Sequence, residues 1–231
     1  MAKKKKSINT NNLMVILLVI TVLVVCGALG FNIYSVLKAD SGAGKTDTVQ
    51  KVGNEYSNDY YTIGNNPTDI NKTYFKELNS ALKDGDNVKI AESLAKTFVT
   101  DYYTWTNKDG NYDIGGIQYI YGPKQSDFET YTLNNFYLDL DLYLTQVDRK
   151  DLIEVKEVTV NSSSEGSYGV QADGQTDEEG NPILTELPGV TVDVSWTYET
   201  SEALETSGFQ SHALVHVVDN NGRWEIAGIE G

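Results

Sequence analysis

Cysteine, histidine, proline and positive charge are all scarce in this chain of 231 residues. The one cysteine, Cys26, excludes a disulfide within the chain and a zinc site built on several cysteine thiolates. Two histidines and four prolines are present. Eighteen lysines and arginines stand against 33 acidic residues, which gives a formal charge of −15. A protein with this much negative charge repels the phosphate backbone of nucleic acids. We therefore expect no binding to nucleic acid.

The basic residues that are present gather at the N-terminus. Four lysines occupy positions 3–6, and the first acidic residue is Asp40. From position 39 onward, 33 acidic residues stand against 13 basic ones. Hydrophobic residues make up 40% of the chain and aromatic residues 10%, a composition typical of a folded protein rather than a disordered one.

A long hydrophobic run follows the lysines. Residues 13–31, LMVILLVITVLVVCGALGF, hold no charge over 19 positions, and a helix of that length spans about 28 Å, close to the thickness of a bilayer core. The lysines before it place the N-terminus in the cytoplasm by the positive-inside rule. We therefore predict a basic cytoplasmic tail at 1–12 and a transmembrane helix at 13–34.

A cleaved secretory signal is the alternative to this anchor. Its apolar region is usually about 7–15 residues long, which is shorter than the run seen here. An exterior domain without disulfides is compatible with the outer face of a bacterial membrane. The prediction is a single-pass protein of a bacterial cell membrane, with its C-terminal domain on the exterior face.

Two further regions follow the predicted anchor. Residues 35–67 are rich in Ser, Gly, Asn, Asp and Thr with little periodic apolar content, which predicts a flexible tether. Residues 68–231 are long enough to bury one core, and we predict a single exterior domain there.

The first part of this domain has helical periodicity. Apolar residues three and four positions apart predict helices at about 70–83, 87–106 and 125–147, with Thr68 or Asp69 as the first N-cap. The third segment is ambiguous, because Leu138, Leu140 and Leu142 also alternate with polar residues as in a strand. Helix is favoured because the segment is longer than a typical strand and holds no Gly or Pro.

The second part has the pattern of strands. We predict strands at 152–160, 190–197, 209–218 and 224–229, a long acidic loop at 161–187, and a hairpin turn at Asn221-Gly222. Helices followed by antiparallel strands predict an α+β domain, with the helices packed on one face of a curved antiparallel sheet.

This order of parts resembles a known family. A lysine-rich N-terminus, one membrane helix, a tether and a domain of helices followed by a strand meander resemble the membrane-anchored nuclear transport factor 2-like proteins of bacteria, and among them the TcpC-like assembly proteins of conjugation and type IV secretion. The supporting segments are FVTDYYTW at 98–105, the strand at 152–160 and the hairpin at 210–229, and the resemblance covers 13–34 and 70–231. It implies a cone-shaped fold and a non-enzymatic scaffold in a cell-envelope machine. The loop at 161–187 departs from the compact meander of that family.

The two histidines are the first candidate site. His212 and His216 lie on one face of a predicted strand, about 13 Å apart, too far for one metal ion. One of them could be a general base in the pocket of a cone, as in isomerase-like relatives. The plainer interpretation, which we favour, places both on a solvated or partner-facing strand.

Two sets of carboxylates are further candidates. Asp139 and Asp141 are two positions apart, so on a helix they do not face each other. The cluster of Asp173, Asp177 and residues 178–179 lacks the ligand pattern of an EF-hand and reads as a solvated loop, with weak calcium binding as the minor alternative. No phosphate-binding loop or metalloprotease motif occurs, and we expect no metal and no cofactor.

Aromatic residues are the last candidates. Tyr and Trp often anchor interfaces, and we predict an interaction surface that includes Tyr103, Trp105, Tyr119 and Tyr121. Tyr102 is expected in the core and Tyr103 nearer the surface.

The prediction for function is a scaffold that docks other envelope proteins, with a homo-oligomer left open. A module that binds a small ligand or a peptide in the cone is the alternative. An enzyme with a pocket His or Asp as base ranks last.

Overall fold

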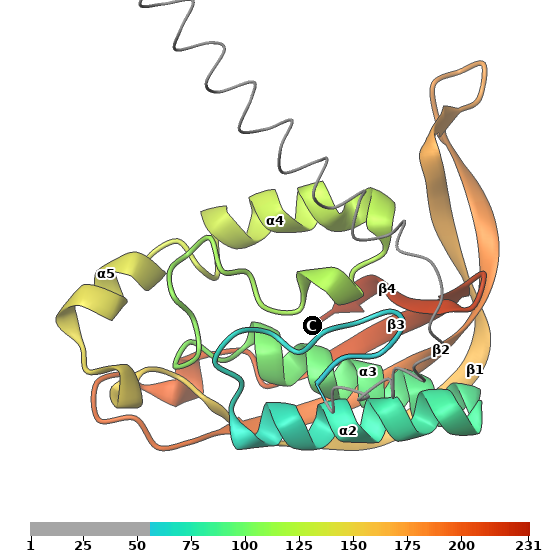
Figure 1. The fold of residues 1–231 in the computed structure, drawn as a ribbon. Helices are drawn as coiled ribbons and strands as arrows, with labels where there is room; N and C mark the ends of the chain where they lie inside the picture. Colours follow the sequence, from blue (N-terminus) through green and yellow to red (C-terminus); the bar gives the residue numbers. More distant parts are fainter. Residues whose placement is uncertain (1–55) are drawn as a thin grey trace, which may run out of the picture. The chain divides into compact units, whose positions relative to one another are not determined.

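The computed structural model describes residues 56–231, apart from the side chains of 172–175 and 182. This part of the chain has an α+β fold with four α-helices and one four-stranded antiparallel sheet, as expected (Figure 1). The basic tail at 1–12, the membrane segment at 13–34 and the tether up to residue 55 lie outside the described residues. Within 56–231, no helix is long and apolar enough to cross a bilayer.

Two well-capped helices open the domain. α2 (Asp69–Asp84) begins with a capping box, in which the Thr68 hydroxyl accepts from the backbone N–H of Asn71 and the Asn71 side chain accepts from the N–H of Thr68. α3 (Asn87–Tyr102) begins at Asp86, whose carboxylate accepts from the N–H of Lys89. Both predicted helices are confirmed.

The second helix ends earlier than its predicted end at residue 106. After Tyr102 the chain turns toward the sheet. The Trp105 N–H donates to the Ile153 carbonyl at 2.8 Å, and the Thr104 hydroxyl accepts from the Val155 N–H at 3.1 Å. These bonds to Ile153 and Val155 replace further helical hydrogen bonds.

The third predicted helix is two helices in the structure, α4 (Gln125–Asn134) and α5 (Leu140–Gln146). The break lies at Asn135, which has φ −133° and ψ −92°. It lets the Tyr137 side chain turn into the core, where it is fully buried and its hydroxyl donates to the Tyr102 carbonyl at 2.9 Å. Burial of Tyr137 therefore outweighs the helix propensity of this segment. Four short 3₁₀ turns complete the helical part: η1 (Ile117–Tyr119), η2 (Gly122–Lys124), η3 (Arg149–Asp151) and η4 (Thr206–Gly208).

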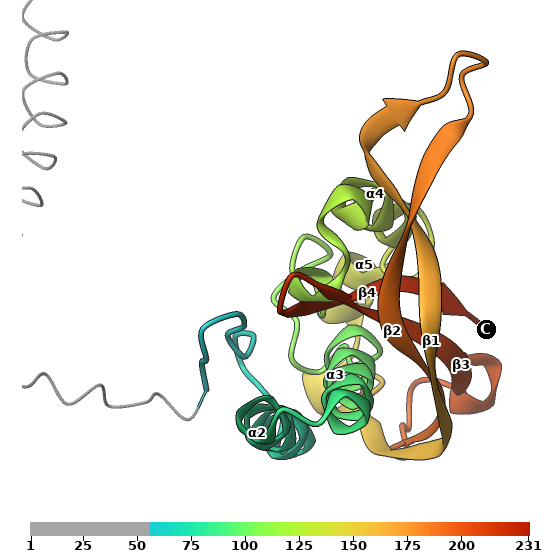
Figure 2. The same cartoon turned by 90° about the vertical axis from the view of Figure 1, so that its right-hand side faces the viewer.

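The sheet has the strand order β1-β2-β3-β4. Its strands are β1 (Val155–Thr176), β2 (Pro182–Tyr198), β3 (His212–Asn220) and β4 (Arg223–Glu230). The predicted Asn-Gly turn joins β3 to β4, with φ of 56° at Asn221 and 91° at Gly222. Figure 2 shows α2, α3 and α4 on the same side of strands β1 and β2.

The acidic loop predicted at 161–187 is wrong. β1 and β2 continue through this region as a long hairpin, with pairs such as Ser164↔Thr191 and Tyr168↔Leu187. Because β3 pairs with β2 only from Gly189 to Ser195, the outer part of the hairpin has one strand neighbour and projects from the domain (Figures 1 and 2). Ser, Gly and Glu have low strand propensity, so their pairing was not visible in the sequence.

The tether predicted at 35–67 is also wrong for its last part. Tyr61 is 2% exposed and its hydroxyl donates to the Trp224 carbonyl, while the Asn58 amide donates to the Asn79 side chain at 2.7 Å. Residues 56–67 therefore pack on the domain that we expected to begin at 68. One buried tyrosine in a polar segment gave no periodic signal.

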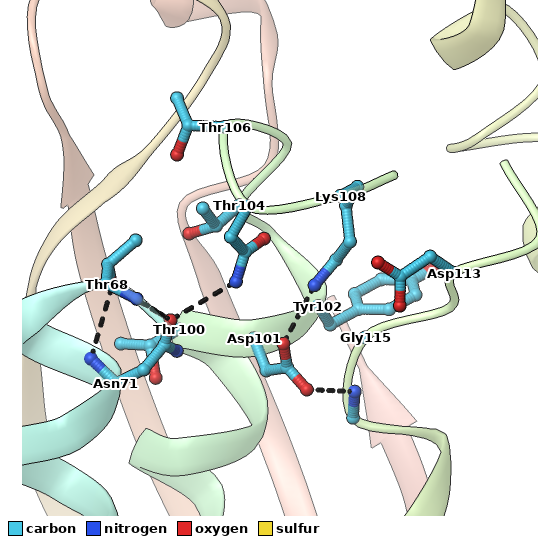
Figure 3. A network of polar contacts seen from close by, with 12 residues as sticks. Thr68, Asn71, Thr100, Asp101, Tyr102, Thr104, Thr106, Lys108, Asp113 and Gly115 are labelled. Carbon is cyan, nitrogen blue, oxygen red and sulfur yellow. Dashed lines mark hydrogen bonds and ion pairs between the residues drawn. The ribbon is translucent and has the colours of Figure 1, made fainter. Parts of the chain in front are cut away.

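A buried ion pair fixes the loop that follows α3. The Lys108 ammonium lies 2.8 Å from Asp101, and the Lys108 side chain is only 2% exposed. The second Asp101 oxygen accepts from the Gly116 N–H at 2.7 Å (Figure 3). Gly116 has φ 71°, and a Cβ there would lie 2.6 Å from the Phe98 ring, so only glycine fits. Asp101 thus holds two parts of the loop on the end of α3.

Candidate functional site

The four aromatic residues predicted to form an interaction surface are buried. Tyr103 and Trp105 are each 4% exposed, Tyr119 is 1% exposed and Tyr121 is 7% exposed. The expectation that Tyr103 lies nearer the surface than Tyr102 is wrong, since both pack among other rings in the core. The Tyr103 ring lies 4.5 Å from that of Trp196 and its hydroxyl donates to Gln210 at 2.9 Å. In this domain these residues pack as core.

Burial also shapes the chemistry of these tyrosines. Loss of water around the hydroxyl raises the pKa of Tyr102 to about 12, and burial raises the pKa of Tyr103 further. The Tyr103 hydroxyl donates to Gln210, and the Tyr102 hydroxyl shares a hydrogen bond of 3.2 Å with the Thr132 hydroxyl.

The two histidines lie on β3 and are each matched with a carboxylate. His212 Nε2 lies 2.9 Å from Asp193 Oδ1, and His216 Nε2 lies 3.1 Å from Glu230 Oε1. His216 also stacks on the Tyr168 ring, with centroids 4.5 Å apart. These are contacts along the sheet, and neither histidine lines the groove described below.

The candidate acids are also separated. Asp139 precedes α5 and Asp141 lies in its first turn, where its carboxylate accepts from the Asn111 N–H at 2.7 Å. Asp177 closes its own turn, and hydrogen bonds from the Asn181 side chain and backbone lower the pKa of its carboxyl. Within residues 56–231 no group of three or more His, Cys, Asp or Glu side chains is placed to hold a metal ion.

Among the grooves of the described domain, one of about 830 Å³ has an aromatic wall; it lies between α4 and β4, and we call it the α4–β4 groove. A second groove, of about 850 Å³, lies at the start of β1 and has no aromatic lining. The apolar wall of the α4–β4 groove consists of aromatic side chains from the end of α3, from α4, from the turn between α4 and α5, and from β1. They are Tyr102, Tyr103, Phe128, Tyr131, Phe136 and Tyr168. Its other side is the last part of β4, residues 226–230, with Gly231.

Tyr131 is the most accessible member of this wall. It is 62% exposed, whereas Tyr102 beside it is 5% exposed. Phe128, one helical turn before Tyr131, packs against Tyr102 with ring centroids 5.1 Å apart. The groove thus grades from a buried aromatic floor to an exposed aromatic rim.

The groove has few charged groups and they are mostly acidic. Lys124, Asp127 and Glu230 line it. The Lys124 ammonium already donates to the Ala227 carbonyl at 2.9 Å. The groove is thus lined by the Asp127 carboxylate, by Glu230, which is matched with His216, and by the partnered Lys124 ammonium.

A sheet edge runs along the groove. The first part of β4 is covered, since Tyr121 donates its N–H to the Ile226 carbonyl at 2.8 Å. A bulge follows at Ala227, where the register with β3 shifts. Among the described residues, 228–230 pair with β3 on one side and with no strand on the other. Backbone groups and an aromatic wall therefore meet at one open site.

The sequence analysis missed this groove. Its one local signal is Phe128 and Tyr131, two aromatic residues three positions apart on a helix with little other apolar content. The rest depends on the break at Asn135 and on the position of β4, which are tertiary features.

Comparisons with models of protein families, with curated proteins and with solved structures returned no match for this chain.

Proposed function

We propose that this chain is a non-enzymatic, membrane-anchored docking protein of a cell envelope, whose exterior domain binds another protein in the α4–β4 groove. The observation that carries the proposal is the joining of an open strand edge with an aromatic wall that ends in the exposed Tyr131. Tyrosine-rich concave surfaces beside free backbone groups are suited to hold a polypeptide.

The sequence supports the membrane part of this proposal. The uncharged run at 13–31 after four lysines fits a single-pass anchor at 13–34 with the N-terminus in the cytoplasm. Such an anchor would place the groove at the exterior face of the membrane, where other envelope proteins are within reach.

The resemblance to nuclear transport factor 2-like assembly proteins supports the scaffold class. Helices that precede an antiparallel sheet and pack on one side of it fit the cone expected for that family. We propose conjugation or type IV-like secretion as the machine on that resemblance alone, because a fold by itself does not give a function.

Site-specific photo-cross-linking in native membranes tests the proposal. A photoreactive residue replaces Tyr131 in the full chain, and a matched variant carries it at Tyr112, which is 75% exposed and lies outside the groove. We expect a discrete adduct with another protein from position 131 and not from position 112. Equal or absent adducts from both positions contradict the docking function.

A binding site for a small ligand or peptide is the second candidate. The groove volume of about 830 Å³ lies within the usual range for ligand pockets, roughly 300–1,000 Å³. A small ligand in the groove would raise the melting temperature of the full-length protein. A Phe128→Ala variant would lose this rise if the ligand sits on the aromatic wall.

A further inference from the structure

We propose that the α4–β4 groove accepts an extended, basic segment of a partner protein, which pairs with residues 228–230 as a fifth strand of the sheet. This inference rests on the proposed docking function and adds the conformation and charge of the bound segment.

The first support is the state of the β4 edge. An unpaired strand edge is a template for another strand, and proteins usually cover such edges. Here the first part of β4 is covered by the chain itself, through the Tyr121–Ile226 hydrogen bond and the Tyr61 hydroxyl on the Trp224 carbonyl. The cover stops at Ala227, and Gly228 and Ile229 are half-buried rather than enclosed. An added strand would continue the line of Ile120, which already forms a bridge with Ile226.

At the opposite edge of the sheet, side chains form hydrogen bonds to the backbone of β1. At Val158 of β1, the Tyr74 hydroxyl both accepts the backbone N–H at 3.1 Å and donates to the carbonyl at 3.3 Å. At Val155 the N–H is bonded by the Thr104 hydroxyl. Side chains thus bond the β1 backbone at Val155 and Val158. A groove of about 850 Å³ also borders the start of β1, at Val155 and Lys156, but no aromatic side chain lines it, whereas six line the groove beside β4.

The second support is the shape beside the edge. In a strand, alternate side chains point to the same face. A segment added to 228–230 would direct every second side chain toward the aromatic wall of Phe128 and Tyr131, which are the groove residues on α4 besides Asp127. Backbone hydrogen bonds would give affinity and these side chains specificity, as in other cases of strand addition.

The third support is charge. Residues 56–231 hold 30 acidic and 11 basic residues, a formal charge of −19. The groove carboxylates Asp127 and Glu230 share this sign; Lys124 is already bonded to Ala227, and Glu230 to His216, which leaves Asp127 as the main charge for a bound segment. A basic segment is attracted to such a surface. A second copy of this chain would bring two strongly acidic domains together, so we assign the groove to a different, basic partner.

Pools of octapeptides test the inference on the full-length protein in detergent. One pool alternates Lys or Arg with Val, Ile or Tyr, and a second pool replaces each basic residue with Glu. A third pool repeats the basic one with alternate backbone nitrogens methylated, which removes the N–H groups that pair with a strand edge. Binding is read by fluorescence anisotropy.

We expect the basic pool to bind, the acidic pool not to bind, and methylation to weaken binding at least tenfold. Asp127→Lys should weaken binding by a similar factor, whereas Glu129→Lys, the same charge change on the same helix outside the groove, should have much less effect. No binding by the basic pool, or equal binding after methylation, overturns the inference.

The two proposals fail in different ways. If position 131 cross-links to a partner but the basic pool does not bind, the docking function stands and the added strand is wrong. If position 131 yields no specific adduct, the docking function itself fails.

Discussion

Helices α3 and α4 lie in the same domain but differ in how much of their surface they bury. α3 has ten buried residues along its 16, from Ile90 to Tyr102. α4 has one buried residue, Thr132, along its 10. A helix buried on most of its surface forms the core, whereas a helix that touches the domain along one narrow stripe leaves space beside it. α3 therefore contributes most to the core and to stability, whereas α4 forms one wall of the candidate binding groove.

The largest expected difference between the two helices is in stability. Phe98→Ala on α3 removes a fully buried ring, so we expect a loss of about 4 kcal/mol in the free energy of unfolding. Phe128→Ala on α4 removes a half-buried ring and should cost about 1 kcal/mol. Urea unfolding followed by tryptophan fluorescence measures both in the full chain. Equal losses would contradict the division between the two helices.

The buried ion pair at the end of α3 gives the next largest effect. Lys108→Met leaves the Asp101 carboxylate, which is 14% exposed, without its cation, and we expect a loss of about 3 kcal/mol in the free energy of unfolding. The double variant Asp101→Asn/Lys108→Met should recover part of it, because no charge is then left unpaired. The same unfolding measurement reports both variants. A double variant with a lower free energy of unfolding than the single variant would disprove the pairing.

Alkaline pH should weaken the α3 side of the domain. The unfolded chain releases a tyrosine proton near pH 10, whereas burial raises the pKa of Tyr102 to about 12 in the folded state. The stability that Tyr102 contributes is therefore full below pH 10 and is lost as the pH rises through about 10 to 12. Tyr102→Phe should have a shallower loss over this window. Melting curves between pH 8 and pH 12 compare the two proteins, and parallel curves would contradict this cause.

The start of α2 gives a smaller effect. Thr68→Ala removes the side-chain half of the capping box, and we expect a loss of about 1 kcal/mol. Thr68→Ser keeps the hydroxyl and serves as the control. Thermal melting compares the stability of the two variants. An equal loss of stability in Thr68→Ser would show that the hydroxyl is not the cause.

The smallest effect on stability should come from the groove rim. Tyr131→Ala removes a side chain that is 62% exposed, so the free energy of unfolding should change by less than about 0.5 kcal/mol. The same variant should lower partner recovery from native membranes. A variant that unfolds easily yet keeps its partner would reverse the roles assigned to the two helices.

The sequence predicted the α3 side of the domain better than the α4 side, and the reason is physical. α2 and α3 have apolar stripes and side-chain caps, which are local signals. Both helices begin within one residue of their predicted starts, although α3 ends four residues early. The break at Asn135 follows from burial of Tyr137, which no local pattern shows. The long hairpin depends on pairing between Ser- and Gly-rich β1 and β2, and such pairing is a long-range property.

The candidate site was predicted least well. Tyr103, Trp105, Tyr119 and Tyr121 were chosen as surface aromatics and are buried, while Tyr60, Tyr112 and Tyr131 are exposed. Aromatic residues fill cores and interfaces with the same chemistry. Which of them reach solvent depends on tertiary contacts, such as those of Tyr119 with Tyr61 and of Trp105 with Phe209, which no local pattern shows.

Amide hydrogen exchange on the full-length protein, alone and with the partner captured through position 131, tests the central claim most directly. In the free protein we expect α3 to be protected, while α4 and residues 228–230 exchange faster. With the partner bound, protection should rise at 228–230 and in α4 and stay unchanged in α3 and at the Asn221-Gly222 turn. A complex in which exchange at α4 and at 228–230 does not change would contradict docking in the groove.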